Sequence, residues 1–376
     1  MTLIPDFFRR LFERKEKIIT FYNTYGYKEE ADAWTIPLRI WVHKRRSLSL
    51  EVVARRVRHK MEADLERPLK DEEATRLKAC LADFVADDDS REPLELVFDE
   101  DSNGAPYRLS RRTNLNGLIE EEIKLPVNKA RELLARQGSK SGWLTLTALS
   151  ESFQAKGRVR LIEPEGVSVV SDIDDTIKVT EVPAGKKIVL ARTFLQGYEE
   201  APGMRDRYLQ IRDEHADASF HYVSGSPWQL YSLLQQFLIT ETGFPEGTFH
   251  MKSLRKNLFD RDSWHDIRNF VIAGESVTLE QKIEQITALM LNLPRRKFIL
   301  IGDSGEKDPE VYRAMVGLFP GQVKEIRIRD VLGERLTEKA GDISISLVPA
   351  KTVFFETRRI AEEKKRAALQ AKEARR

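Results

Sequence analysis

Two patterns of hydrophobic and polar residues divide the chain near Pro164. Before this point, short segments alternate apolar with polar residues and are rich in β-branched and aromatic side chains, which is typical of half-buried strands. After this point, continuous apolar runs alternate with amphipathic segments, which predicts a mainly parallel sheet with helices on both faces. The expected strands of the first part are 18–27, 35–43, 94–98, 118–125, 143–149 and 158–162.

The elements predicted from these patterns give four units. In the first part, helical patterns at 49–65 and 72–85 interrupt the strands, so we expect a β-sandwich with a helical insertion. In the second part, strands at 167–171, 219–224, 297–302 and 323–328 are separated by helices at 204–214, 227–242, 279–293 and 309–318. The expected units are an N-terminal helix at 1–16, a β-rich accessory domain at 17–165, an α/β domain at 166–350 and a charged C-terminal helix at 351–376.

The two predicted terminal helices differ in character. Residues 1–16 place Leu3, Ile4, Phe7 and Phe8 on one face and basic residues elsewhere, as in a helix that lies on an anionic membrane. The alternative is that this face packs on the protein itself. The C-terminal segment is rich in charge and alanine, which favours a projecting helix.

The balance of charge and the number of cysteines exclude some classes of protein. The chain of 376 residues has 62 basic and 60 acidic side chains, so no overall field attracts nucleic acid. A single cysteine, Cys80, permits no disulfide within the chain and favours a reducing compartment. No apolar run approaches the length of a membrane span, and Arg9 and Arg10 interrupt any signal-peptide pattern. We expect a cytoplasmic protein, with peripheral membrane contact as its closest association with lipid.

The clearest candidate for chemistry follows the apolar run 167–171. Asp172, Asp174 and Thr176 share one parity along an extended chain, so their side chains can converge just beyond the strand. In an open α/β fold this edge of the sheet holds the active site. Two clustered carboxylates suit either a Mg²⁺ site or an acid–base pair, and the alternative is a strand end followed by a helix cap.

Polar residues also follow other predicted strands. Ser224, Gly225 and Ser226 form a strand-to-helix turn whose hydroxyl and N–H groups suit phosphate oxygens, although a serine there is also an ordinary helix cap. Asp303 and Asp308 follow the strand at 297–302. Carboxylates from separate loops are the ligands that a hard divalent cation requires. Lys282 lies on an amphipathic helix, where a lysine is most often solvated.

Taken in chain order, these motifs resemble the haloacid dehalogenase superfamily of aspartate-nucleophile phosphatases. They resemble one family within it more closely, the Mg²⁺-dependent phosphatidate phosphatases of the Asp-x-Asp-x-Thr type. The residues that carry this resemblance are 171–178, 202–204, 224–231, 244–247 and 301–310. They lie between residues 167 and 331, and the N-terminal part is matched only as a β-rich accessory domain.

The resemblance implies a reaction and a set of roles. Asp172 would attack phosphorus to form an aspartyl-phosphate, and Asp174 would protonate the leaving alkoxide and then deprotonate water. Ser224 and Lys282 would bind the transferring phosphoryl group. The resemblance further assigns substrate contacts to Thr176, Gly225 and Ser226, and Mg²⁺ to Asp172, the Asp174 main-chain carbonyl and Asp303, with Asp308 in its outer shell. The implied substrate is phosphatidate and the implied product is diacylglycerol.

The spacing of the motifs bears on the substrate. The segments between Thr176 and Ser224 and between Ser226 and Lys282 leave little room for an independent cap domain, so we expect an open site. An open site suits a phosphate carried by a lipid. The alternatives are a phosphatase for a soluble or protein-bound phosphate, and a membrane or cytoskeletal adaptor without activity. A scaffold would not require all four of the residues Asp172, Asp174, Lys282 and Asp303, so their presence argues against the adaptor.

Overall fold

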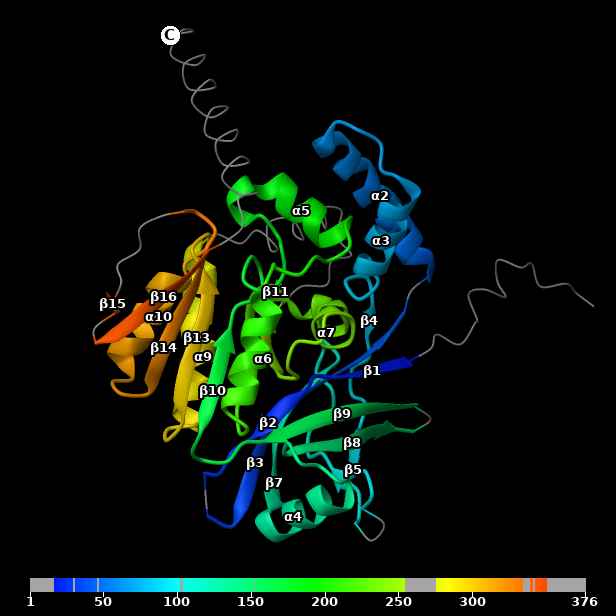
Figure 1. The fold of residues 1–376 in the computed structure, drawn as a ribbon. Coiled ribbons are helices and arrows are strands. Elements are labelled where there is room, and N and C mark those ends of the chain that lie inside the picture. Colours follow the sequence, from blue (N-terminus) through cyan, green and yellow to red (C-terminus); the bar gives the residue numbers. More distant parts are fainter. Residues whose placement is uncertain are drawn as a thin grey trace, which may run out of the picture.

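The computed structural model describes residues 17–29, 31–45, 47–101, 104–151, 153–253, 275–333, 339–340 and 342–349. The helices expected at 1–16 and 351–376 lie outside the described residues. The described chain forms three sheets flanked by helices, a mixed α/β architecture (Figure 1).

Two of the sheets belong to the N-terminal part and share one hydrophobic core. The four-stranded sheet has β3 (Ala33–Lys44) at its centre, paired antiparallel with β1 (Lys17–Phe21), β4 (Asp87–Asp88) and β7 (Leu118–Pro126). The five-stranded sheet has the order β2 (Thr24–Gly26), β9 (Phe153–Leu161), β8 (Trp143–Ser150), β5 (Glu95–Phe98) and β6 (Tyr107–Arg108). Alternate residues such as Ile36 and Leu144 meet between the sheets because neighbouring side chains of a strand point to opposite faces.

Three helices accompany these sheets. α2 (Ser47–Leu65) and α3 (Asp71–Leu81) form the expected helical insertion. The start of α3 is fixed by Glu73, which accepts a hydrogen bond from the N–H of Lys70 at 2.9 Å. α4 (Val127–Arg136) follows β7 directly and buries Ala130 and Leu133, but the sequence pattern did not predict it. The helix is short and buries only these two apolar residues, so its sequence pattern is weak.

The third sheet contains seven strands and forms the α/β part. Its order is β12 (Thr248–Lys252), β11 (Ser219–Pro227), β10 (Val167–Ser171), β13 (Lys297–Asp303), β14 (Val323–Asp330), β16 (Ile343–Pro349) and β15 (Lys339–Ala340). All neighbouring strands are parallel except β15 and β16. All residues of β10 are buried, as expected for a central parallel strand. The sequence pattern predicted β10, β11, β13 and β14 but missed β12, β15 and β16.

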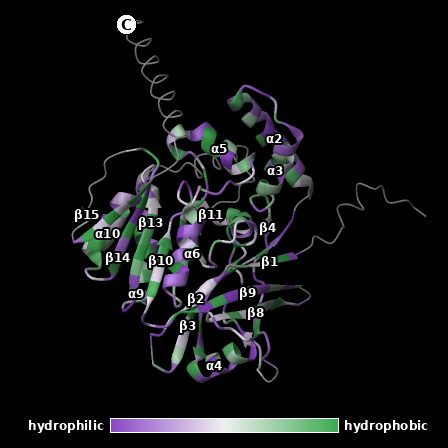
Figure 2. Ribbon diagram, in the orientation of Figure 1, coloured by the Kyte–Doolittle hydropathy of each residue, from purple (hydrophilic) through white to green (hydrophobic). Residues whose placement is uncertain are grey.

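Helices cover both faces of this sheet. On one face, α6 (Met204–Glu214) and α7 (Tyr231–Gln235) share a core with Val169 and Ile299. On the other, α9 (Glu275–Asn292) and α10 (Asp308–Leu318) share a core with Val170 and Leu300. Figure 2 shows apolar residues concentrated along β10 and β13, between these helical layers. None of the helices in the described ranges has the length and apolar composition needed to cross a bilayer.

The segment after β11 differs from the single helix expected at 227–242. β11 continues to Pro227, whose backbone is extended and which has no N–H to donate. A 3-10 turn at Trp228–Leu230, helix α7 and a π-helical turn at Gln236–Glu241 then follow. The serine motif therefore lies inside the last residues of a strand.

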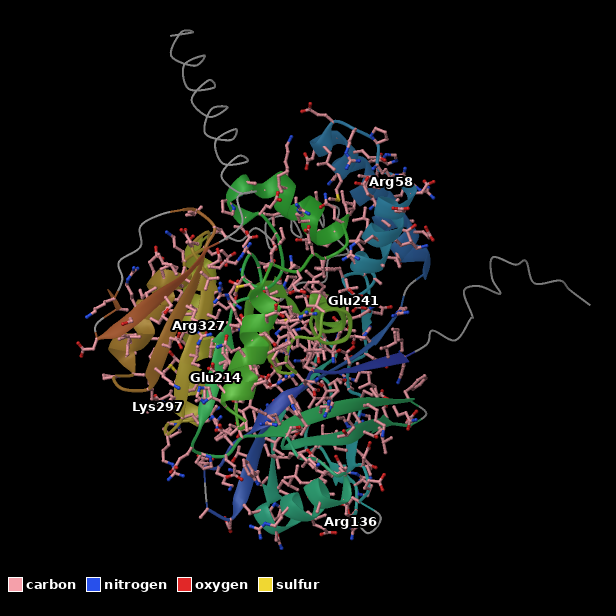
Figure 3. The ribbon with its side chains drawn as sticks, viewed as in Figure 1. Arg58, Arg136, Glu214, Glu241, Lys297 and Arg327 are labelled. Carbon is pink, nitrogen blue, oxygen red and sulfur yellow. The ribbon has the colours of Figure 1, made fainter. Side chains whose placement is uncertain are left out.

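The N-terminal sheets and the α/β part are packed together. Tyr22 and Trp41 belong to the same hydrophobic cluster as Val169, and the phenol of Tyr231 accepts a hydrogen bond from the N–H of Asn23 at 3.1 Å. α3 packs against α5 (Lys186–Phe194) within this cluster. Charged side chains such as Arg58 on α2 and Arg136 on α4 lie at opposite ends of the molecule (Figure 3).

Candidate active site

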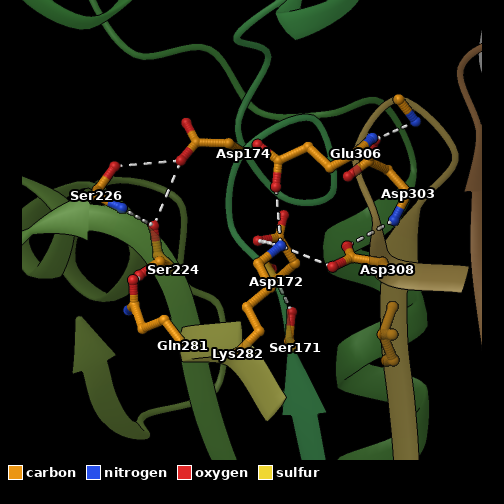
Figure 4. A network of polar contacts seen from close by, with 12 residues as sticks. Ser171, Asp172, Asp174, Ser224, Ser226, Gln281, Lys282, Asp303, Glu306 and Asp308 are labelled. Atoms are coloured by element: carbon orange, nitrogen blue, oxygen red, sulfur yellow. Dashed lines mark hydrogen bonds and ion pairs between the residues drawn. The ribbon is translucent and has the colours of Figure 1, made fainter. Parts of the chain in front are cut away.

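Polar residues from three adjacent strands meet at one edge of the seven-stranded sheet. β10 pairs in parallel with β11 and with β13, so their carboxyl ends lie together. Asp172 follows β10, Ser224 lies in the last part of β11, and Asp303 ends β13 (Figure 4). This is the edge at which open α/β sheets hold their ligands.

Lys282 lies at the centre of this group. The side chain comes from α9 and is only 2% exposed. Its ammonium donates hydrogen bonds to Asp172 Oδ1 at 2.8 Å, Glu306 Oε2 at 2.8 Å and Asp308 Oδ1 at 2.7 Å (Figure 4). Burial alone would lower the pKa of Lys282, but the three carboxylates outweigh it and raise the pKa well above its ordinary value. The lysine is charged and buried instead of solvated.

Asp172, Asp303 and Glu306 form a candidate cation site. Each offers one carboxylate oxygen, and these oxygens lie within 4.8 Å of one another. Asp172 Oδ2 and Asp303 Oδ2 are buried and have no hydrogen-bond partner among the described residues. Burial, together with nearby carboxylates, raises the pKa of both Asp172 and Asp303 well above the ordinary value. Buried, unpaired carboxylate oxygens at this spacing fit a hard divalent cation such as Mg²⁺.

Asp308 lies beside this cluster and supports it. It is completely buried at the start of α10, where its Oδ2 accepts a hydrogen bond from the N–H of Asp303 at 3.2 Å. A side chain at Gly302 would collide with the Asp308 carboxylate, so glycine is required there. The structure thus places Asp308 against Lys282 and the Asp303 backbone. Glu306, which the sequence analysis did not name, completes the acidic cluster instead.

Asp174 is held by four side chains. Its Oδ2 accepts hydrogen bonds from Ser226 Oγ at 3.2 Å and Ser224 Oγ at 3.4 Å. Its Oδ1 lies 2.8 Å from Lys178 Nζ and 2.7 Å from Thr180 Oγ1. Burial alone would raise the pKa of Asp174, but the Lys178 ammonium and these hydrogen bonds outweigh it and lower the pKa.

The remaining predicted residues lie around this carboxylate. Thr176 is completely buried, and its hydroxyl has no hydrogen-bond partner among the residues described. Gly225 lies between the two serines, where the N–H of Ser226 donates to Ser224 Oγ at 3.0 Å. Gln281, next to Lys282, donates from Nε2 to the Ser224 carbonyl at 3.3 Å. The turn is therefore fixed by hydrogen bonds from within and from α9.

Asp175 shapes the loop that follows β10. Its carboxylate accepts hydrogen bonds from the N–H groups of Thr180, Glu181 and Val182 at 2.8, 2.7 and 2.6 Å. Its backbone is left-handed, with φ at +55°, and its carbonyl accepts a hydrogen bond from Arg329 at 2.6 Å. Neither Asp175 nor Lys178 was predicted as a site residue. Their only signal was a third carboxylate and a cation within the Asp172 motif.

The comparisons with known proteins concern this part of the chain. A family model described as the catalytic domain of phosphatidate phosphatase APP1 matches residues 167–330. This segment is therefore similar to that family. A segment of 183 residues, 48% of the chain, is 34% identical to phosphatidate phosphatase APP1 of Saccharomyces cerevisiae and covers 28% of that protein. A segment of 178 residues, 47% of the chain, is 32% identical to an uncharacterized protein of Schizosaccharomyces pombe and covers 27% of it.

The matches to the APP1 catalytic-domain family have a limited extent. The chain spans little more than a quarter of the length of either curated relative. A solved carbohydrate esterase aligns over 87% of this chain and 90% of its own, with 13% identity and a TM-score of 0.22. That likeness is too weak to carry an argument about the fold.

Proposed function

We propose that this protein is a Mg²⁺-dependent phosphatidate phosphatase with a haloacid dehalogenase-like catalytic domain. It hydrolyses phosphatidate to diacylglycerol and phosphate. The observation that carries the proposal is the unpaired, buried Oδ2 of Asp172, located at the end of a central parallel strand beside Lys282 and Asp303. The match of residues 167–330 to the model of the APP1 catalytic-domain family supports this assignment.

Asp172 is the nucleophile in this account. Lys282 holds Oδ1, which leaves Oδ2 to attack the phosphorus atom. The new bond joins Oδ2 to phosphorus, and the bond from phosphorus to the ester oxygen breaks. The product of this step is an aspartyl-phosphate on Asp172 and a departing alkoxide.

Asp174 handles the protons. Because the Lys178 ammonium lowers the pKa of Asp174, the carboxylate is ionised in the free protein, and the proton that it passes to the alkoxide comes from the P–OH group of a substrate monoanion. The carboxylate then removes a proton from the water molecule that attacks the aspartyl-phosphate. Ser224 and Ser226 hold its Oδ2, while Lys178 and Thr180 hold its Oδ1, so the carboxylate is kept in one orientation. A fixed orientation is what proton transfer at a defined atom requires.

The phosphoryl group would be bound by residues at the end of β11, in the loop after β10 and on α9. Ser224, Ser226, Gly225 and Thr176 supply hydroxyl and N–H donors, and Lys282 supplies positive charge. Mg²⁺ would be held by Asp172, Asp303 and the Asp174 carbonyl, with Asp308 in the outer shell, and would neutralise charge on the phosphoryl oxygens. The carboxylate oxygens of Asp172, Asp303 and Glu306, which lie within 4.8 Å of one another, favour a cation at this point.

The choice of a lipid substrate rests on the family and on the open site expected from the motif spacing. We further propose a cytoplasmic protein that contacts membranes peripherally, with the segment at 1–16 as the contacting helix, and expect no nucleic-acid partner. The enzymatic alternative keeps the chemistry and replaces the lipid by a soluble or protein-bound phosphate. The buried, fully paired ammonium of Lys282 disfavours an adaptor, because a scaffold has no need for it.

A single assay separates these functions. Phosphate release is measured with Mg²⁺ from phosphatidate in mixed micelles and from a soluble aryl phosphate, for the wild type and Asp172→Asn. Release from the lipid that disappears in the variant supports phosphatidate hydrolysis. Release from the soluble ester alone supports the enzymatic alternative, and no release from either supports the adaptor.

A further inference from the structure

The ammonium of Lys282 has no hydrogen left for a substrate. A lysine ammonium can donate three hydrogen bonds. In the structure, all three are accepted by the carboxylates of Asp172, Glu306 and Asp308. If Lys282 is to bind a phosphoryl oxygen, one of these carboxylates must leave it. This step rests on the proposed function.

Only one of the three carboxylates is placed to leave. Asp172 is 1% exposed and Asp308 is fully buried, and Asp308 is also fixed by the N–H of Asp303. Glu306 lies in the short loop between β13 and α10, and its side chain is 22% exposed. The displaceable group is therefore Glu306.

The Glu306 carboxylate already borders the candidate cation site. Its oxygen lies within 4.8 Å of oxygens on Asp172 and Asp303, and the Oδ2 atoms of those two residues have no hydrogen-bond partner in the described ranges. A cation at this point would attract the Glu306 carboxylate directly. The movement from Lys282 to the cation requires only a change within one side chain.

The charges of the site require such an exchange. Around Lys178 and Lys282 lie the carboxylates of Asp172, Asp174, Asp303, Glu306 and Asp308. An incoming phosphate monoester meets an excess of negative charge, and it cannot share the Lys282 ammonium with Glu306. We propose that Glu306 exchanges Lys282 for the bound divalent cation when a phosphoryl group arrives. In the free protein, Glu306 therefore accepts the hydrogen bond of Lys282 that a phosphoryl oxygen would take. When a phosphoryl group is bound, Glu306 is a ligand of the cation.

The test measures binding without turnover. Isothermal titration of the full chain with MgCl₂ in the presence of saturating inorganic phosphate, and separately with inorganic phosphate alone, is carried out for the wild type and Glu306→Gln. We expect Mg²⁺ to bind about ten-fold more weakly to Glu306→Gln, because a carboxylate ligand is lost. We expect phosphate to bind about ten-fold more tightly, because it displaces a neutral amide instead of a charged acceptor from Lys282.

Two further variants make the result decisive. Glu310→Gln removes a carboxylate from the same region, where Glu310 pairs with Lys307 and is 48% exposed, and should leave both affinities unchanged. Glu306→Asp keeps the charge on a shorter side chain, so its Mg²⁺ affinity should recover towards the wild type.

Opposite shifts of the two ligands support the exchange. Affinities that do not change in Glu306→Gln, or that change in the same direction, overturn the exchange alone, provided that the wild type binds both ligands. A wild type that binds neither Mg²⁺ nor phosphate overturns the exchange and the proposed phosphatase together.

Discussion

Lys178 Nζ lies 2.8 Å from Asp174 Oδ1, and Lys178 is only 2% exposed. Both residues lie in the loop after β10, and Asp174 is the residue that we propose as the proton donor. Lys178 also donates to Thr180 Oγ1 at 2.6 Å and lies 5.0 Å from the ring centre of Tyr198. The ammonium thus holds the loop and the carboxylate together.

Replacement of Lys178 should therefore destabilise the protein strongly. Lys178→Met leaves the Asp174 carboxylate without its cation, and we expect the free energy of unfolding to fall by about 3–5 kcal/mol. Lys307→Met is the matched control, because Lys307 pairs with Glu310 at the surface and a change below about 1 kcal/mol is expected there. Urea denaturation of both variants checks the difference. If Lys178→Met and Lys307→Met lose the same free energy of unfolding, the buried pair stabilises the protein no more than the surface pair does.

The loop after β10 should depend on the Asp175 side chain. Asp175→Ala removes the acceptor of three backbone N–H groups and places alanine at φ +55°, so we expect a loss of roughly 2–4 kcal/mol. Asp175→Asn keeps one acceptor oxygen and tolerates this conformation better, so its loss should be smaller. Hydrogen exchange at the amides of residues 180–182 measures the effect. Unchanged protection in Asp175→Ala would contradict this role.

Stability at mildly acidic pH should depend on His43. The ring stacks on Trp41 at 3.7 Å between centroids, and burial lowers the pKa of His43 to about 3. Between this value and about 6.5, the unfolded chain binds the proton that the folded protein excludes, so the free energy of unfolding falls as the pH falls. Above about pH 6.5 neither state is protonated and this effect vanishes.

The contribution of His43 appears as a difference between variants. Between pH 7 and pH 5, we expect the free energy of unfolding of the wild type to fall by about 2 kcal/mol because of His43. This part of the fall should be absent in His43→Gln. His59→Gln serves as the control, since the His59 side chain is 73% exposed. Urea denaturation at both pH values tests this. Parallel pH dependence in the wild type and His43→Gln would contradict it.

Removal of the cation should expose the repulsion between the carboxylates. Without Mg²⁺, Asp303→Asn should unfold at a higher temperature than the wild type, because it removes a buried carboxylate that lies near other carboxylates and whose Oδ2 has no hydrogen-bond partner among the described residues. With Mg²⁺ in excess, the wild type should gain stability and the variant should gain little. Asp206→Asn, at a side chain that is 76% exposed, should follow the wild type. The measurement is thermal unfolding of the three proteins with EDTA and with Mg²⁺. If Mg²⁺ raises the unfolding temperature of Asp303→Asn as much as that of the wild type, Asp303 is not a ligand of the cation.

The sequence predicted the central strands well because burial on both faces leaves a direct mark. Val169 and Val170 face opposite helical layers, so β10 carries valine on both faces and only small serines between. β12 contains Thr248 and His250, and β16 alternates polar with apolar residues, so neither gives this signal. These two strands could not be recognised from the sequence without their neighbours in the sheet.

The residues of the candidate site could also be predicted only in part. Asp172, Asp174 and Asp303 were predictable because they interrupt apolar strands at their ends. Glu306 and Lys178 lie among other charged residues, and only the folded chain shows that Lys178 is buried and that Glu306 contacts Lys282. Lys282 entered the prediction through the order of the motifs, since its helix alone indicates a solvated side chain.

The central claim is that Asp172 carries the phosphoryl group. The most direct measurement is rapid acid quenching of a phosphatidate reaction during turnover, followed by mass spectrometry of the peptides from the wild type and Asp172→Asn. The account predicts a wild-type peptide that contains Asp172 and is heavier by one phosphoryl group, with no such peptide from the variant. Turnover that proceeds without this modification, or with the phosphoryl group on another residue, would contradict the account.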